Sequence, residues 1–254
     1  MMSPKRLTLA TASALLITSS IQSQVDPFAE ETKAKQAPRM IRVQAEFIEM
    51  PHATHTRLMA KPRATTNDAD LRATCAELVE AGEARVIESL SVTALPGQIT
   101  VTESISEHIY PTELDPPALP NKVAAVTPPI PDPKIPPGNP PAPSAFETRN
   151  VGSTLEVEAV ILDDFSLPIV DLQLAPSIVY YEKENTWNKW STDEVSIDFR
   201  VPQFFVLQAN TGTTVVSGQP QMMATLSTQN ENGFTDTSRK IMLFVRADIL
   251  SVDQ

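Results

Sequence analysis

From Ala145 to the end of the chain, apolar and polar residues alternate in short runs. Successive side chains of a β-strand point to opposite faces of a sheet, so this period of two is typical of strands with one buried face. The runs fall at 155–161, 170–174, 195–199, 203–209, 213–217, 221–227 and 241–249. Short strands at such spacing predict a mainly β protein with an antiparallel β-sandwich-like domain, for which an immunoglobulin-like arrangement is one form.

The N-terminal part contains a similar strand. Apolar residues from Ile41 to Phe47 alternate with polar ones, Glu49 occupies the next position on the apolar side, and Pro51 ends the run. Two more strands are predicted at 85–95 and 99–110, with the turn residues Pro96 and Gly97 between them. This spacing predicts a β-hairpin.

One short helix is predicted between these strands. Asn67 is a good N-cap residue, and Gly82 can end the helix in the left-handed conformation. An apolar stripe joins Leu71, Cys75, Leu78 and Val79. Cys75 is the only cysteine, so it cannot form an internal disulfide, and its place on the stripe favours a small core residue over a reactive thiol.

Residues 111–143 hold 13 of the 23 prolines of the chain. Proline fixes φ and lacks a backbone donor, so neither a helix nor a central strand is expected there. We expect an extended, polyproline-like insert that serves either as a semi-rigid linker or as a docking segment for a partner.

The first 23 residues are typical of a secretory signal peptide. Lys5 and Arg6 precede an apolar run from Leu7 to Ile17, which is too short to span a membrane as a helix. The expected organisation is a signal peptide at 1–23, a flexible lead-in at 24–38, a strand–helix–hairpin part at 39–110, the proline-rich insert at 111–143 and an antiparallel β part at 144–254, with 39–254 as one domain.

Composition and motifs disfavour several functional classes. The net charge is −11, so the basic surface that binds nucleic acid is not expected. His52 and His55 have a spacing that suits a metal, but the third histidine, His108, is remote and Cys75 lies on the apolar stripe. No catalytic or phosphate-binding motif occurs. We expect no enzymatic activity, no metal site and no cofactor.

One stretch concentrates the residues used in recognition. The segment YYEKENTWNKW contains Tyr180, Tyr181, Trp187 and Trp190 in a polar, loop-like context. Exposed aromatic side chains stack on sugars or anchor protein interfaces, so these four are the candidate binding residues. The alternative is that Tyr180 or Trp187 covers the end of the β core.

Three segments also carry a family resemblance through their order. They are RVQAEFIEM at Arg42–Met50, LVEAGEARVIESLSVTALPGQ at Leu78–Gln98 and FETRNVGSTLEVEAVI at Phe146–Ile161. IVDLQLAPSI at Ile169–Ile178 and SRKIMLFVRADIL at Ser238–Leu250 follow. This series resembles the C-terminal region of bacterial secretins, the outer-membrane rings of type II and III secretion and of type IV pili.

The sequence departs from secretins near its end. The Val-Pro-x-Leu-Gly-Asp segment typical of secretins is missing, and the polar stretch Thr228–Thr237 precedes the last strand. The resemblance therefore implies a secretin-derived β-domain that has lost pore formation.

The resemblance implies an exported protein of the periplasm, outer membrane or cell surface. It would act as an accessory or assembly component of a type IV pilus or type II secretion apparatus, with the protein components of that machinery as partners. The alternatives are a surface-exposed, immunoglobulin-like adhesion module for host glycan or protein, and a minimal secretin channel. The sequence leaves open whether the chain forms a homo-oligomer or associates with a membrane.

Overall fold

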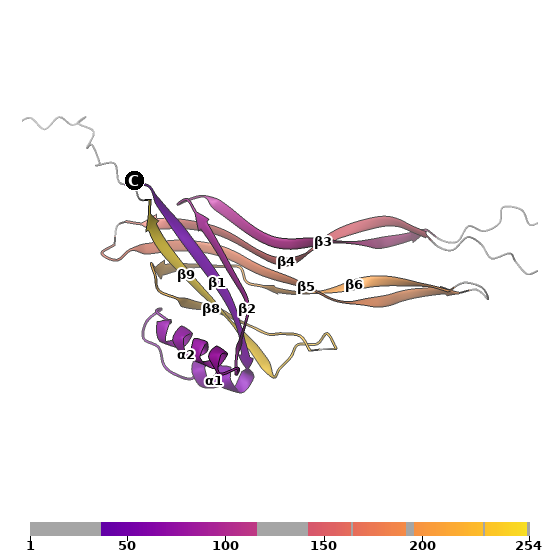
Figure 1. Cartoon of the computed structure of the whole chain (residues 1–254), viewed down its shortest axis with the longest axis horizontal. Coiled ribbons are helices and arrows are strands. Elements are labelled where there is room, and N and C mark those ends of the chain that lie inside the picture. Colours follow the sequence, from indigo (N-terminus) through magenta and orange to yellow (C-terminus); the bar gives the residue numbers. More distant parts are fainter. Residues whose placement is uncertain (1–36, 116–141, 164, 192–195, 231, 253–254) are drawn as a thin grey trace, which may run out of the picture. The chain divides into compact units, whose positions relative to one another are not determined.

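The chain folds mainly into antiparallel strands that form two sheets, with two short helices on one side (Figure 1). The computed structural model describes residues 37–115, 142–163, 165–191, 196–230 and 232–252. The elements are β1 (Arg39–Pro51), α1 (His52–Met59), α2 (Ala69–Glu80), β2 (Arg85–Ala94), β3 (Ile99–Asp115), β4 (Ala142–Leu162), β5 (Ile169–Ser191), β6 (Ser196–Gln208), β7 (Thr211–Val216), β8 (Gln221–Leu226) and β9 (Arg239–Ser251). The signal peptide and most of the lead-in and the proline-rich insert lie outside the described residues.

The first sheet has the strand order β2-β1-β9-β8, and the second has the order β3-β4-β5-β6 with β7 paired to β5. The main core lies between the sheets, as the alternating pattern predicts. Its buried residues include Ile41, Val43, Ala45 and Phe47 of β1, Leu155, Val157 and Ala159 of β4, and Ile241, Leu243, Val245 and Ala247 of β9. Burying each large aliphatic or aromatic side chain contributes about 1.5–3 kcal/mol, so this layer is the main source of stability.

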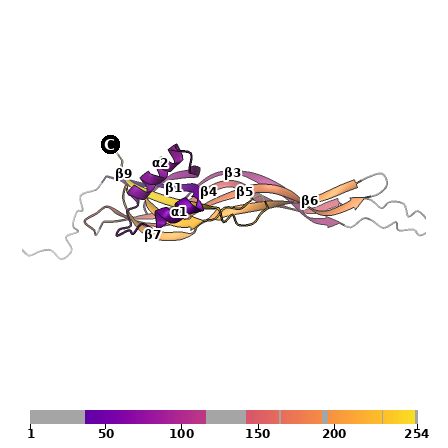
Figure 2. The same ribbon diagram turned by 90° about the horizontal axis from the view of Figure 1, so that it is seen from below.

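The helices cover the other face of the first sheet (Figures 1 and 2). Here Cys75 of α2 packs with Ile48 and Met50 of β1 and with Met242 and Phe244 of β9. The predicted helical stripe is therefore confirmed as a packing surface. Gly82 has φ +72°, so the predicted left-handed helix end is confirmed as well.

Two local predictions need correction. The sequence predicts one helix, but a second, α1, begins directly after Pro51. This helix is only 8 residues long and buries only Leu58, so its sequence contains no apolar stripe like that of α2. In α2, Asp68 rather than Asn67 occupies the N-cap position, although the Asn67 side chain accepts a hydrogen bond from the Ala69 N–H at 2.9 Å.

The predicted hairpin of β2 and β3 is wrong. β2 pairs with β1 in the first sheet, whereas β3 pairs with β4 in the second. The turn at Pro96 and Gly97 carries the chain from one sheet to the other. Strands of both sheets have one apolar face toward the core. The alternating pattern of β2 and β3 is therefore the same whether they pair with each other or lie in different sheets.

The second sheet divides into two ribbons. β4 and β5 pair from Gly152 with Val179 to Leu162 with Ile169, and their remaining halves do not pair with each other. Beyond this point residues 105–115 of β3 pair with 142–152 of β4, here called the β3–β4 ribbon. Residues 180–191 of β5 pair with 196–205 of β6, here called the β5–β6 ribbon (Figures 1 and 2).

Candidate functional site

The four predicted aromatic residues lie on β5, and the stretch Tyr180–Trp190 is strand rather than loop. Its polar character matches the exposure of the β5–β6 ribbon, where most side chains of β5 after Tyr180 are exposed. Adjacent strand residues face opposite sides, so Tyr180 and Tyr181 serve different surfaces.

The Tyr180 side chain faces the main core. Its ring stacks on Phe205 with centroids 6.2 Å apart, and both rings pack against the main core. Burial, with the charge of Glu88, raises the pKa of the Tyr180 hydroxyl. Tyr180 therefore covers the end of the β core, as the alternative to a binding role predicts.

Tyr181 joins the two ribbons on the opposite side. Its ring centroid is 4.9 Å from that of His108 on β3 and 6.3 Å from that of Phe204 on β6. Phe204 in turn lies 5.8 Å from Tyr110 of β3. Such tilted and edge-on pairs contribute about 0.5–1.5 kcal/mol each. These aromatic contacts connect the ribbons where hydrogen bonds between β4 and β5 have ended.

Trp187 is the most exposed of the four, with 66% of its surface accessible. It occupies a β-bulge, since the pairing with β6 passes from Thr186 directly to Asn188. It lines a cavity of about 600 Å³ with Tyr110, Pro111, Thr112, Asn185, Thr186, Val201, Pro202 and Gln203, here called the ribbon cavity. Trp190 pairs with Ile197 further along the ribbon and does not line this cavity.

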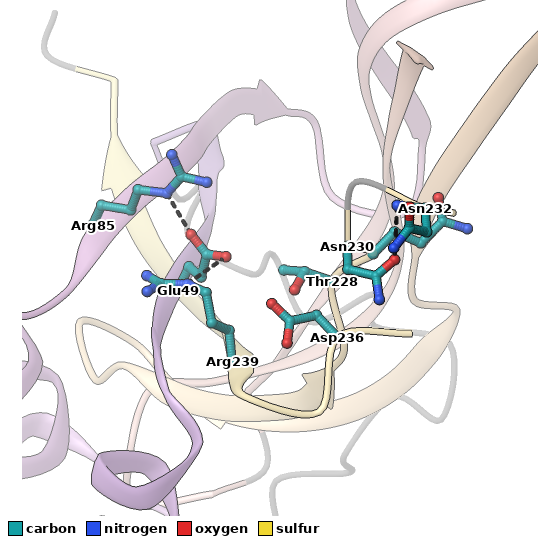
Figure 3. A pocket seen from close by; sticks show the side chains of 8 residues that line it. Glu49, Arg85, Thr228, Asn230, Asn232, Asp236 and Arg239 are labelled. Carbon is teal, nitrogen blue, oxygen red and sulfur yellow. Dashed lines mark hydrogen bonds and ion pairs between the residues drawn. The ribbon is translucent and has the colours of Figure 1, made fainter. Parts of the chain in front are cut away.

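A second pocket, of about 670 Å³, contains a buried acid that the sequence analysis did not select (Figure 3). Glu49 is only 2% exposed. One carboxylate oxygen accepts a hydrogen bond from the Arg85 guanidinium, and the other lies 2.9 Å from Nε of Arg239. The loop with Thr228, Asn230 and Asp236 faces this group across the pocket (Figure 3).

The geometry of this pocket favours a structural role. Both Glu49 oxygens are engaged by guanidinium groups, so this side chain joins Arg85 of β2 to Arg239 of β9. Asp236 accepts hydrogen bonds from the Ser238 N–H at 2.7 Å and the Ser238 hydroxyl at 2.6 Å, and these bonds lower its pKa. The sequence contains one indication of this cluster. Glu49 follows Phe47 at the next position on the inward side of β1, where a buried acid requires a cationic partner.

The rings of His52 and His55 lie 6.4 Å apart on α1, but each histidine contacts a different group. His52 donates from Nδ1 to the Thr237 carbonyl at 2.8 Å, His55 Nε2 lies 3.1 Å from the Thr225 hydroxyl, and His108 belongs to the aromatic contacts. Within the described residues no three His, Cys, Asp or Glu side chains are grouped as a metal site. The described helices are all too short or too polar to cross a membrane.

Comparisons with known proteins place this chain near secretin structures at low similarity. No protein-family model matches it, and no curated protein matches it. The type II secretin GspD from enteropathogenic Escherichia coli is 15% identical, with a TM-score of 0.40 over 85% of this chain and 70% of that one. Aeromonas hydrophila ExeD is 13% identical, with a TM-score of 0.42 over 86% and 50%.

The Salmonella SPI-1 type III secretion secretin InvG is 8% identical, with a TM-score of 0.37 over 85% of this chain and 62% of that one. The chain thus spans 50% to 70% of the length of these three solved chains. At this level of similarity, the function has to be inferred from the residues of the chain itself.

Proposed function

We propose that this protein is an exported, non-enzymatic envelope component that assembles with, or supports, a type IV pilus or type II secretion apparatus. The sequence resemblance to secretins supports this proposal. The resembling segments form β1, the end of α2 with β2, and the middle of β4. β1 and β4 contribute to the same core.

The edge strand β3 is the observation that best supports assembly with another protein. Within the described residues β3 pairs only with β4, so its other edge lacks a strand partner along 17 residues. One side of β3 presents Ile99, Val101, Ile105 and Ile109, which are 65%, 47%, 37% and 65% exposed, and the exposed Glu103 and Glu107 lie between them on the same side. Unpaired backbone groups beside these apolar side chains favour pairing with another strand.

Pairing at this edge would require no catalytic residue. An added strand gains backbone hydrogen bonds along β3, and the four apolar side chains provide burial and register. The partner is a component of the secretion or pilus machinery, or a second copy of this chain. The minimal channel remains an alternative outcome, in which many copies join into a ring.

The first test uses the chain from residue 24 onward and its Val101→Lys/Ile105→Lys variant. We expect the parent to capture pilus or secretion components in a pull-down and the variant to lose them, since two buried ammonium groups would oppose pairing. Ser106→Lys is the matched control, because Ser106 is also exposed on β3 but faces the other side.

Light scattering of the same samples, in buffer and with detergent or liposomes, separates the alternatives. A monomer or small oligomer that ignores lipid supports an accessory component. A large ring that resists detergent and conducts ions across liposomes contradicts the accessory role and favours the channel. Equal capture by the parent and the double lysine variant would show that the β3 edge is not the assembly surface.

A second candidate is an adhesion module for host glycan or protein. The exposed indole of Trp187 beside a cavity is the observation that favours it. Glycan-array binding that is lost in Trp187→Ala and retained in Trp190→Ala would support this function. Pull-down of secretion components without glycan binding would reject it.

A further inference from the structure

The ribbon cavity has the chemistry of a polyproline-binding groove. One wall consists of Tyr110, Pro111 and Thr112 of β3, and the other is formed by β5 and β6 around Trp187 and Pro202. Flat aromatic rings and prolines thus face a common space between two ribbons that share no strand pairing there. This lining combines apolar platforms with a polar edge that includes Asn185 and Gln203, as is usual for a binding cleft.

The backbone directs Trp187 into this cavity. Residues Thr186 and Asn188 pair with Arg200 and Phe199, and the bulge leaves Trp187 between them without a partner on β6. Bulges re-aim side chains, and an indole that remains 66% exposed beside a cavity gains from an apolar ligand.

The polar edge of the cavity is held in place. The Asn185 amide donates to Gln203 Oε1 at 2.8 Å, and the Gln203 amide donates to Glu182 Oε2 at 2.7 Å. A polyproline II chain makes no internal hydrogen bonds, so its carbonyls accept from donors such as an indole N–H while its rings pack on aromatic faces. Trp187 supplies both kinds of contact.

The chain itself contains a matching ligand. Six prolines occur in PPIPDPKIPP at 128–137, within the 26 residues that lie outside the described structure between Asp115 and Ala142. Asp115 pairs with Ala142, so this segment leaves and returns at one end of the β3–β4 ribbon. Tyr110 is five residues before that end, about 17 Å along a strand at about 3.3 Å per residue.

We propose that residues 128–137 of the same chain dock in the ribbon cavity, with their prolines packed on Trp187 and Tyr110. At about 3.1 Å per residue in polyproline II, residues 116–127 span about 37 Å and residues 138–141 about 12 Å. The N-terminal end of the segment can therefore reach Tyr110 while its C-terminal end stays near the end of the ribbon. Attachment beside the cavity gives the segment an effective concentration on the order of millimolar, so a weak contact suffices. The insert is then a ligand of its own domain rather than only a linker.

The test measures the exposure of Trp187 in the full chain. Trp190→Phe leaves Trp187 as the only tryptophan, and a second variant adds Pro→Ala changes at 128, 129, 131, 133, 136 and 137. Docking predicts that acrylamide quenches the Trp187 emission about twofold more strongly when the prolines are absent. A synthetic peptide of residues 127–137, added to the proline-free chain, should restore protection saturably.

Two controls define specificity. The Trp187→Phe chain reports from Trp190, which does not line the cavity, and its quenching should not respond to the proline changes. A peptide with alanine in place of proline should have no effect. Circular dichroism of each variant verifies that the β fold is intact.

The remaining outcomes overturn the proposal. Equal quenching with and without the prolines, and no response to the peptide, would show that the cavity does not bind this segment. Protection that increases with protein concentration would assign the cavity to the segment of a second copy. Protection by oligosaccharide but not by the peptide would identify a carbohydrate site.

Discussion

At the scale of single residues, the ion pairs of Glu49 join a buried carboxylate to two more exposed guanidinium groups. The Glu49 side chain is 3% exposed, whereas those of Arg85 and Arg239 are 70% and 37% exposed. If Glu49 is removed, water can solvate both guanidinium groups. If both arginines are removed, a buried carboxylate loses its partners, which is the costlier change.

We therefore predict that Arg85→Ala/Arg239→Ala lowers the free energy of unfolding by about 3 kcal/mol, and Glu49→Gln by only about 1 kcal/mol. Urea denaturation at neutral pH measures both values. Arg42→Ala is the control, because Arg42 lies 3.6 Å from Asp248 with half of its side chain exposed, and it should cost less than either change. Equal losses in the two cluster variants would contradict the asymmetry.

His55 is expected to make stability depend on pH. Burial, followed by the charges of His52 and Lys240, lowers its pKa in the folded protein from 6.5. The unfolded chain then binds the proton more tightly, so this contribution is complete above about pH 6.5 and is lost as pH falls through the folded pKa.

Denaturation at about pH 7.5 and about pH 5 should therefore show a fall in the free energy of unfolding that is smaller in His55→Gln. The carboxylates contribute equally to the fall in the parent and in His55→Gln. The difference between the two falls in the free energy of unfolding is therefore the contribution of His55. Identical pH profiles would mean that the His55 pKa is not lowered on folding.

At the scale of elements, Gly152 sets the point at which the second sheet divides. It has φ +132°, and a Cβ at this position would lie 2.1 Å from the Ser104 carbonyl oxygen. It pairs with Ile105 on one side and Val179 on the other, the last pair before β4 and β5 separate. Only glycine allows this approach of β4 to β3.

Gly152→Ala should lower the free energy of unfolding by about 2 kcal/mol or more, because the methyl group displaces the β3 backbone. Gly212→Ala is a matched control on β7, where a Cβ would make ordinary contacts at 3.7 Å and 3.8 Å and cost about 1 kcal/mol at most. Guanidinium denaturation of both variants provides the comparison. Equal effects would show that the β4 approach can relax.

Pro176 illustrates how a strand interior accommodates proline. β5 pairs with β7 up to Leu174 and with β6 from Ser177 onward. Pro176 pairs with Leu155 of β4 on one side, and on the other side it lies at the gap between β7 and β6, where a missing backbone donor interrupts neither of those two ladders.

At the scale of the whole molecule, the two sheets share one core. Phe47 of β1 is fully buried between them, and Cys75 lies on the opposite face of the first sheet under α2. Burial, which outweighs the opposing charges of Arg72 and Arg63, raises the pKa of the Cys75 thiol to about 11. The thiol should thus react with a thiol reagent only when the domain opens.

We predict a single unfolding transition seen alike by Cys75 reactivity and by tryptophan emission from β5. Phe47→Ala should lower the free energy of unfolding by about 3–5 kcal/mol and move both signals together, because it creates a cavity in the shared core. Trp190→Ala on the ribbon should move neither by more than about 1 kcal/mol. Separate midpoints for the two probes would show that the sheets unfold independently.

The sequence by itself determined where most strands lie and which side of each faces the core. Ile241 and Leu243 face the core between the sheets and Met242 faces the helices as their alternation predicts, and α2 buries Cys75 and ends at Gly82. These features are local, because the period of side-chain direction is fixed by the backbone of each element. The candidate binding role of Trp187 also comes from the sequence and stays a prediction.

Only the tertiary structure decided which strands pair and which side chains meet. β2 and β3 are adjacent in sequence but lie in different sheets, and Glu49 meets Arg239 from the far end of the chain. Tyr180 and Tyr181 are neighbours with opposite environments, and Trp187 and Tyr110 line one cavity between ribbons that separate after Gly152. Such pairings depend on contacts between remote segments and on bulges that change side-chain direction, which a local period does not encode.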